Sequence, residues 1–294
     1  MYLTGFADEA AADLDGQIRA TRELGWRNIE SRNIDGKNIH NMPDDAFDVA
    51  AGKLDAAGVK INCFGSEIAN WGKKITDPFE ITLAEVGRAI PRMQRLGTRL
   101  IRIMSYAVLP EREPGDQMEE ERFRRVRILH QMFTEAGLTP VHENCMNYGG
   151  MSWQHTLRLI EHVPGLKLVF DTGNPVFTDD RARARPYPKQ SSWEFYTHVK
   201  EHVAYVHVKD GVWDPGTQQI TYTYPGEGDG DVVRIVKDLL QSGYDGGISI
   251  EPHMAIVHHD ASVASPEEQR FRTYVEYGHR MERIIAGVQK GGAE

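Results

Sequence analysis

The sequence predicts an α/β protein built as one domain, a (β/α)8 barrel over residues 1–294. Eight short β-rich runs alternate with amphipathic segments at intervals of roughly 30 to 40 residues, which is the pattern of such a barrel. Glycines mark the ends of the amphipathic segments, and several β-rich runs end in a charged or imidazole side chain. A doubly wound open sheet is the alternative, but it normally gathers its ligands at one switch point. The polar residues here are spread over several strand ends, which favours the barrel.

The strands are predicted from short runs rich in β-branched and aromatic residues that stand between turn residues. In chain order these runs are residues 3–6, 28–30, 60–64, 99–104, 139–143, 167–170, 203–207 and 247–251. The long connections, at residues 65–76, 105–115, 174–191 and 210–230, all follow strands. In a barrel they therefore lie on the face where active sites are built.

The helical segments between these runs carry their own start and stop signals. Five of them end in a glycine just before a strand, at Gly25, Gly58, Gly97, Gly137 and Gly243. Glycine readily takes the left-handed conformation that ends a helix. Asp77 and Ser265 are each followed by a proline and, three residues after the cap, by a glutamate, which predicts a capped helix start at both places. The second start predicts a C-terminal helix over about 265–288, followed by a frayed tail at residues 289–294.

Composition limits the partners of this chain. Its net charge of −9 argues against a nucleic-acid partner, because duplex binding draws most of its affinity from basic residues. No apolar run approaches the roughly 18 residues of a membrane helix, and the N-terminus lacks the pattern of a signal peptide. Only Cys63 and Cys145 are present, too few for a disulfide framework. We therefore expect a cytoplasmic protein in a reducing compartment, with no membrane partner.

Four of the predicted strands in the second half deliver one metal-capable side chain each at their carboxyl ends. These side chains are Glu143, Asp171, His207 and Glu251. Adjacent strand ends converge at the rim of a barrel, so the four would surround one point. Three carboxylates and one imidazole suit one divalent metal ion, such as Mn²⁺, Mg²⁺, Co²⁺ or Zn²⁺. The alternative is that each is an ordinary strand-end residue that bonds to loop backbone.

Six short motifs along the chain carry a family resemblance. They are Gly5-Phe6-Ala7-Asp8-Glu9, Val141-His142-Glu143-Asn144, Phe170-Asp171-Thr172-Gly173-Asn174, His207-Val208-Lys209-Asp210, Gly226-Glu227-Gly228 and Ser249-Ile250-Glu251-Pro252-His253. In order and spacing, over nearly the whole chain, they resemble the xylose isomerase-like TIM-barrel superfamily of sugar isomerases and epimerases. The resemblance implies that the four strand-end residues hold the metal and that Glu143 and Glu251 exchange protons with the substrate. It also implies a homo-oligomer.

The implied activity is isomerisation or epimerisation of a small sugar or keto-sugar. A divalent ion that chelates a carbonyl and a neighbouring hydroxyl stabilises an enediolate, and Glu143 and Glu251 then serve as paired acid and base for the α-proton. A dehydratase or lyase that acts on a keto-inositol or 3-keto-glycoside by β-elimination shares this first step. An alternative of another class is a barrel that binds carbohydrate without turnover.

Asn174 narrows the choice within the superfamily. Endonuclease IV-like DNA-repair relatives hold three zinc ions and have a histidine at this position, and ketose epimerases commonly have one too. Asparagine here argues for one ion, against DNA repair, and against a free-ketose C3-epimerase. The run His207-Val208-Lys209-Asp210 instead resembles the inosose dehydratase branch and branches of uncharacterised isomerases.

Further residues are candidates for substrate contact. Lys209 and His253 each follow a candidate ligand by two residues and so share its orientation. Arg102 lies near the end of the fourth strand, and Trp71 and Tyr148 lie on loops that could form an apolar wall against a sugar ring.

Three other residues near the site are interpreted as structural or supporting residues and not as substrate contacts. Glu30 and Arg32 stand at or just after the end of the second strand and are interpreted as barrel-interior charge pairs. His142 alternates with Glu143, so we expect a supporting role for it.

The substitution Asp171→Ala tests the predicted metal site. Because one of four ligands is removed, we expect the purified variant to lose its bound divalent ion, as measured by elemental analysis. A variant that keeps as much metal as the unmodified protein would contradict the site.

Overall fold

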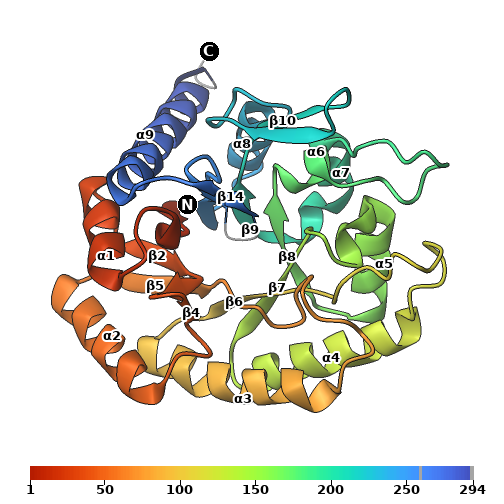
Figure 1. The fold of residues 1–294 in the computed structure, drawn as a ribbon, viewed down its shortest axis with the longest axis horizontal. Helices are drawn as coiled ribbons and strands as arrows, with labels where there is room; N and C mark the ends of the chain where they lie inside the picture. The colour runs from red at the N-terminus through yellow and green to blue at the C-terminus, as the bar shows by residue number, and fades with distance from the viewer. Residues whose placement is uncertain (258–259, 292–294) are drawn as a thin grey trace.

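Eight parallel strands form the centre of the molecule in the computed structural model, which describes residues 1–257 and 260–291 (Figure 1). The strands are β1 (Tyr2–Gly5), β2 (Asn28–Ser31), β5 (Lys60–Phe64), β6 (Leu100–Ile103), β7 (Thr139–Glu143), β8 (Lys167–Asp171), β9 (Val203–Val208) and β12 (Gly247–Ile250). Their order in the sheet is β1-β12-β9-β8-β7-β6-β5-β2. A parallel bridge between Phe6 and Glu30 brings the two edge strands together, so the sheet is a nearly closed barrel and not an open one.

The predicted fold class is confirmed, and each of the eight predicted strands begins and ends within one residue of its predicted limits. The order of neighbours in the sheet follows the order along the chain, as expected when each strand is joined to the next by a crossover helix.

Helices surround the barrel on its outside (Figure 1). They are α1 (Leu14–Glu23), α2 (Asp44–Ala57), α3 (Phe79–Leu96), α4 (Glu119–Glu135), α5 (Trp153–His162), α6 (Asn174–Phe177), α7 (Ser192–Val199), α8 (Val232–Gln241) and α9 (Glu267–Gly291). Short 3-10 turns occur at Ala7–Glu9, Gly149–Met151 and Lys200–His202. None of the helices in the described part of the chain is both long and apolar enough to cross a membrane.

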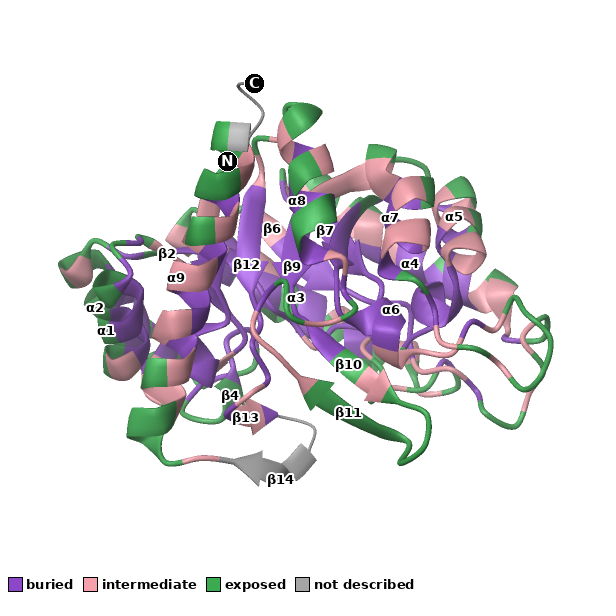
Figure 2. Ribbon diagram, turned by 90° about the horizontal axis from the view of Figure 1, so that it is seen from above, coloured by how far each residue is buried: buried purple, intermediate pink, exposed green. Residues whose placement is uncertain are grey.

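Three small hairpins extend from the loops that follow barrel strands. They pair β3 (Asn33–Ile34) with β4 (Lys37–Asn38), β10 (Gly211–Asp214) with β11 (Gln219–Tyr222), and β13 (Ile256–Val257) with β14 (Asp260–Ala264). Figure 2 shows β10, β11 and β13 on the same side of the barrel. These hairpins lengthen the wall at the carboxyl ends of the strands.

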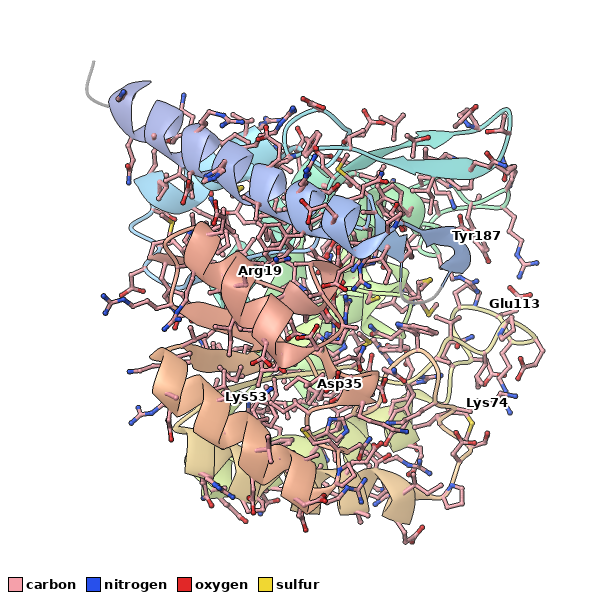
Figure 3. The ribbon with its side chains drawn as sticks, turned by 60° about the vertical axis from the view of Figure 1, so that its left-hand side comes forward. Arg19, Asp35, Lys53, Lys74, Glu113 and Tyr187 are labelled. Atoms are coloured by element: carbon pink, nitrogen blue, oxygen red, sulfur yellow. The ribbon has the colours of Figure 1, made fainter. Side chains whose placement is uncertain are left out.

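The main apolar core lies between the strands and the helices. Figure 2 shows buried strands at the centre and helices whose outer faces are exposed. At the edge of this layer α9 packs against α1, where the guanidinium of Arg19 lies 4.2 Å from the centroid of the Phe271 ring (Figure 3). The helices thus bury one stripe each, as an amphipathic pattern requires.

A second, smaller apolar cluster fills the inside of the barrel. It consists of one side chain from each of four strands: Cys63, Val141, Val169 and Tyr205. Side chains alternate along a strand, so the next inward-facing position lies two residues further on. On β7, β8 and β9 that position is occupied by Glu143, Asp171 and His207. The register of the strands therefore places a polar layer directly above an apolar one.

The five glycines predicted to end helical segments all have a positive φ. Gly58 and Gly97 are the C-caps of α2 and α3, with φ of 64° and 66°. In this left-handed region a residue with a Cβ atom is strained.

The predicted cap at Asp77 is wrong. Helix α3 begins at Phe79 with Pro78 at the N-cap position, and the Asp77 carboxylate accepts a hydrogen bond from the Lys74 N–H, at 2.8 Å. The carboxylate is thus already used in the preceding turn. At the other predicted start, α9 begins at Glu267 and extends to Gly291, so residues 289–291 are helical and not frayed. The rest of the predicted tail, residues 292–294, lies outside the described residues.

Alanine substitutions at two glycines of α3 should have opposite effects on stability. A Cβ atom would meet nothing within 4 Å at either Gly87 or Gly97, so only backbone conformation differs between them. We expect Gly97→Ala to lower the free energy of unfolding by about 1–2 kcal/mol because of its positive φ. The control Gly87→Ala, inside the helix, should raise it by about 0.5–1 kcal/mol. Urea unfolding measures both, and a stabilising Gly97→Ala would contradict this account.

Candidate active site

The four predicted metal ligands meet at the carboxyl end of the barrel. Ligand atoms of Glu143, Asp171, His207 and Glu251 all lie within 4.8 Å of one another, and all four residues are buried. Asp171 is directly opposite His207 in the pairing of β8 with β9. The Glu251 N–H donates to the Val208 carbonyl at 2.9 Å, which ties the end of β12 to the end of β9. The strand register thus brings the four side chains together.

Asp171 is held in one orientation by its neighbours. Its Oδ1 accepts hydrogen bonds from the N–H groups of Gly173 and Asn174, at 2.8 and 2.7 Å. The side chain of Asn144 accepts from the Asp171 N–H at 2.7 Å and donates to its carbonyl at 3.0 Å. These contacts leave Oδ2 as the oxygen available to the site.

His207 lies between two glutamates. Its Nε2 is 3.0 Å from Glu30 Oε2, and its Nδ1 is 3.3 Å from Glu143 Oε1. Because Glu30 occupies the Nε2 side, Nδ1 is the nitrogen that faces Glu143, one of the other candidate ligands. A carboxylate behind a ligating histidine is a common arrangement that sets the tautomer and the ring orientation. Glu30, predicted to form a charge pair inside the barrel, is therefore paired with His207, a residue of the candidate site.

Three basic side chains balance the carboxylates. Arg102 Nη1 lies 3.1 Å from Glu143 Oε2, and Arg32 Nη1 lies 2.9 Å from Glu251 Oε1. Lys209 Nζ lies 3.2 Å from Asp171 Oδ2 and 3.0 Å from Glu251 Oε2. Such partners are needed because an isolated charge is costly to bury.

The buried pairs shift the pKa values of the site. Burial would raise the pKa of Glu143, but Arg102 and His207 together outweigh it and the pKa falls to about 2. Burial raises the pKa of Asp171 to about 6, with Lys209 acting in the opposite direction. Burial would lower the pKa of His207, but Glu30 and Glu143 raise it to about 10. The protein thus attracts positive charge to this point.

The residues present fit a divalent metal ion. Within the described residues, Asp171 Oδ2 and Glu143 Oε2 are buried oxygens without a hydrogen bond, although each has a basic nitrogen nearby. Buried polar atoms in folded proteins are normally satisfied, so such atoms call for a partner. Carboxylate oxygens with one imidazole nitrogen are a ligand set suited to Mg²⁺, Mn²⁺, Co²⁺ or Zn²⁺.

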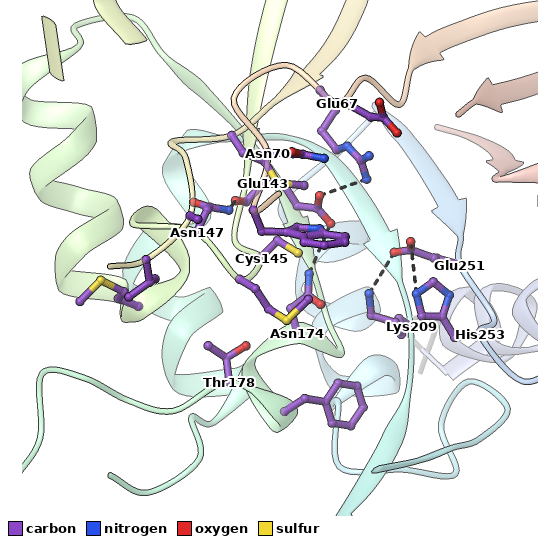
Figure 4. A pocket seen from close by; sticks show the side chains of 18 of the residues that line it. Glu67, Asn70, Glu143, Cys145, Asn147, Asn174, Thr178, Lys209, Glu251 and His253 are labelled. Atoms are coloured by element: carbon purple, nitrogen blue, oxygen red, sulfur yellow. Dashed lines mark hydrogen bonds and ion pairs between the residues drawn. The ribbon is translucent and has the colours of Figure 1, made fainter. Parts of the chain in front are cut away.

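A cavity of about 760 Å³ opens at this end of the barrel, and of the four candidate ligands Glu143 and Glu251 line it (Figure 4). Glu143 and Glu251 reach it from different sides, with Lys209 and His253 beside Glu251. Of the predicted substrate contacts, five line the cavity: Asn174, Lys209, His253, Arg102 and Trp71. The Asn174 amide nitrogen lies 3.3 Å from Glu143 Oε1, so this side chain also contacts one of the four candidate ligands.

The family model for the xylose isomerase-like TIM barrel matches residues 18–275. The chain belongs to this family. The family resemblance predicted from the six motifs is thereby confirmed.

Solved structures with this fold cover nearly the whole chain. A xylose isomerase-like TIM barrel protein from Mycobacterium smegmatis, in complex with magnesium, is 17% identical, with 98% of this chain and 97% of that one covered and a TM-score of 0.69. A D-tagatose 3-epimerase-like protein is 14% identical, with 99% of each chain covered and a TM-score of 0.70. The probable 3-DHS dehydratase AsbF from Bacillus anthracis is 14% identical, with 92% and 98% covered and a TM-score of 0.64. No curated protein sequence matches the chain significantly.

Tyr148 does not reach the cavity of this xylose isomerase-like barrel. Its ring is fully buried against Phe123 and His155, and its hydroxyl donates to Glu119. The ring therefore packs between loop and helix instead of forming the expected wall. His142 is also directed away, since its Nε2 lies 3.0 Å from Ser105 Oγ, and burial lowers its pKa to about 4.

Two supporting residues were missed by the sequence analysis. Glu9 accepts hydrogen bonds from the N–H of His253 at 2.7 Å and pairs with its Nδ1 at 2.8 Å, so it fixes the ring from the far side. Asn144 holds the backbone of Asp171. Both stand next to a strand end within a family motif, which is the signal that could have found them.

The substitution Glu30→Gln should change how stability depends on pH. In the folded protein the pKa of His207 is raised from the ordinary 6.5 to about 10. The protonated imidazole therefore stabilises the fold at low pH, and this contribution is lost as the pH rises toward about 10. In metal-free protein we expect Glu30→Gln to flatten this decline, because the largest charge that holds the proton is removed. Thermal unfolding between pH 6 and 10 in the presence of a chelator measures it.

The matched control is Glu67→Gln, which changes a carboxylate that lines the cavity. For this variant, stability should decline with pH as steeply as it does for the wild-type protein. Equal slopes for Glu30→Gln and the wild type would contradict the role assigned to Glu30.

Proposed function

We propose that the protein is a divalent-metal-dependent isomerase or epimerase of a small sugar or keto-sugar. The observation that supports this is the placement of Glu143 and Glu251 within one group of four metal-capable side chains at the floor of a cavity. Two carboxylates at such a point are suited to remove and return a proton on a carbon next to a carbonyl group.

Glu143, Asp171, His207 and Glu251 would hold the ion. When bound, a divalent ion supplies Lewis-acid polarisation of a substrate carbonyl and stabilises the negative charge that develops on its oxygen. The remaining roles belong to the side chains of the protein.

Both glutamates are ionised in this environment, as a proton acceptor must be. Burial would raise the pKa of Glu251, but Lys209, His253 and Arg32 hold it well below the usual value. Arg102 does the same for Glu143. We infer that one glutamate takes the α-proton and that the same or the other glutamate returns it, to give the isomer or the epimer.

Lys209 and Asn174 position the reacting groups. The Lys209 ammonium donates a hydrogen bond to Glu251 at 3.0 Å and forms an ion pair with Asp171, so it keeps donor capacity for a substrate oxygen. The Asn174 amide orients Glu143. His253, held by Glu9, lies at the same end of the cavity and contributes to substrate binding.

Elimination from a keto-inositol or 3-keto-glycoside is the second candidate. It begins with the same proton removal and then needs a donor for the leaving oxygen. Lys209 and His253 favour it, because their nitrogens lie 3.0 and 3.7 Å from Glu251 oxygens and so flank the base. The neighbouring structures are named as an epimerase-like protein and as a probable dehydratase, so this fold is compatible with both outcomes.

Proton exchange in D₂O tests the proposal. With a panel of keto-sugars and inososes and added Mg²⁺ or Zn²⁺, we expect NMR to detect loss of the α-proton signal in the wild-type protein. Glu143→Gln and Glu251→Gln should each lower the exchange rate by about 10²–10⁴-fold, because an amide is no proton acceptor at neutral pH.

Glu67→Gln provides the control for this experiment, since it changes a cavity-lining carboxylate outside the four. It should exchange protons at nearly the wild-type rate. Exchange that survives both glutamate substitutions would refute the catalytic roles. Sugar binding without any exchange would favour a carbohydrate-binding barrel.

A further inference from the structure

The cavity extends well beyond the side chains that the proposed chemistry needs. Its volume of about 760 Å³ lies in the upper part of the range of roughly 300–1,000 Å³ that is typical of drug-sized ligands. The catalytic side chains occupy its floor, at the ends of the barrel strands. A single sugar ring on that floor leaves most of the space above it unfilled.

The part of the cavity above the floor has a mixed lining, in which several apolar side chains stand among polar and charged ones such as Asn70, Asp179 and Lys189. Its wall includes the side chains of Trp71, Val108, Met146, Phe177, Ile220 and Tyr222. They come from the loops after β5, β6 and β7, from α6 and from β11, so separate segments contribute apolar groups to one surface. We call this surface the apolar wall. It contrasts with the floor, where Glu143, Lys209 and Glu251 meet.

Three members of the apolar wall are exposed at the mouth. Trp71, Met146 and Ile220 have exposed fractions of 38%, 44% and 37%. Single exposed apolar residues are common, but apolar residues from several loops that line one cavity indicate a binding surface. A single free sugar ring on the floor is too small to cover apolar side chains from all of these segments.

We infer that the substrate is a keto-sugar joined to an apolar group of aromatic size, that is, a glycoside with an apolar aglycone. This inference rests on the proposed function and specifies its substrate class. The sugar occupies the floor, and the aglycone lies against the apolar wall. Because a glycosidic bond blocks the anomeric carbon, the carbonyl is on another ring carbon, and the reaction is epimerisation or elimination and not aldose–ketose isomerisation.

Pairs of glycosides that differ only in the aglycone test this inference. In the presence of Mg²⁺, calorimetric titration compares the methyl and phenyl glycosides of D-glucose, D-galactose and D-mannose, in both anomers. For at least one pair we expect the phenyl compound to bind about tenfold more tightly or better, because its ring is removed from water. The double variant Met146→Ser, Ile220→Ser should reduce this ratio to about threefold or less.

The matched control is the double variant Val49→Ser, Ile81→Ser. It removes two equally apolar side chains that are 61% and 54% exposed and lie outside the cavity lining. It should keep the wild-type ratio. A ratio near one for every pair overturns the inference, as does a preference that the Met146 and Ile220 substitutions leave unchanged. A change of oligomeric state in that variant without a change in the ratio would assign the wall to subunit contact instead.

Failure of this inference is distinguishable from failure of the proposed function. A protein that exchanges α-protons of free keto-sugars but shows no phenyl preference keeps the function and loses the aglycone surface. A protein with the phenyl preference but no proton exchange on any keto-sugar retains the surface and loses the function.

Discussion

The structure depends on the balance of buried charge at the carboxyl end of the barrel. Three carboxylates brought within a few ångströms of one another cannot remain ionised in a dry interior without nearby positive charge. Arg32, Arg102 and Lys209 supply it, each from a different strand or strand end. The same ion pairs that offset the cost of burying these charges also keep Glu143 and Glu251 deprotonated. Under the proposed function, stability and reactivity therefore come from one set of contacts, with a buried apolar layer next to it inside the barrel.

Two kinds of segment, strand ends and loops, form different parts of the cavity. Strand ends hold the charged floor, where small displacements would change the chemistry, and a rigid sheet limits such displacements. Loops and the β10–β11 hairpin provide the apolar wall, which needs shape and surface more than fixed geometry. A change in loop sequence could therefore alter which group is recognised while Glu143 and Glu251 stay in place.

The sequence predicts the strands and the four-residue group well because both depend on short local patterns. A β-rich run limits a strand, and parallel strands in chain order must bring their carboxyl ends to one rim. Such local patterns do not predict the packing of Tyr148. Its place on a loop is evident from the sequence, but the direction of its ring depends on Phe123 and on other contacts distant in sequence. Asp77 was misassigned because a carboxylate before a helix has two competing sets of N–H partners. The orientation of Asn144 likewise follows only from the register of β7 with β8.

The contact between Glu30 and His207 joins residues 177 positions apart in the chain. Arg32 and Glu251, separated by 219 positions, do the same across the closing edge of the barrel. Glu30 and Arg32 are therefore synthesised long before their partners His207 and Glu251. A chain that lacks its last barrel strand and the Glu251 that follows it has an incomplete group of candidate ligands. Under the proposed function, metal affinity therefore reports on whether the barrel has closed. An ion that binds only the closed form in turn shifts the folding equilibrium toward closure.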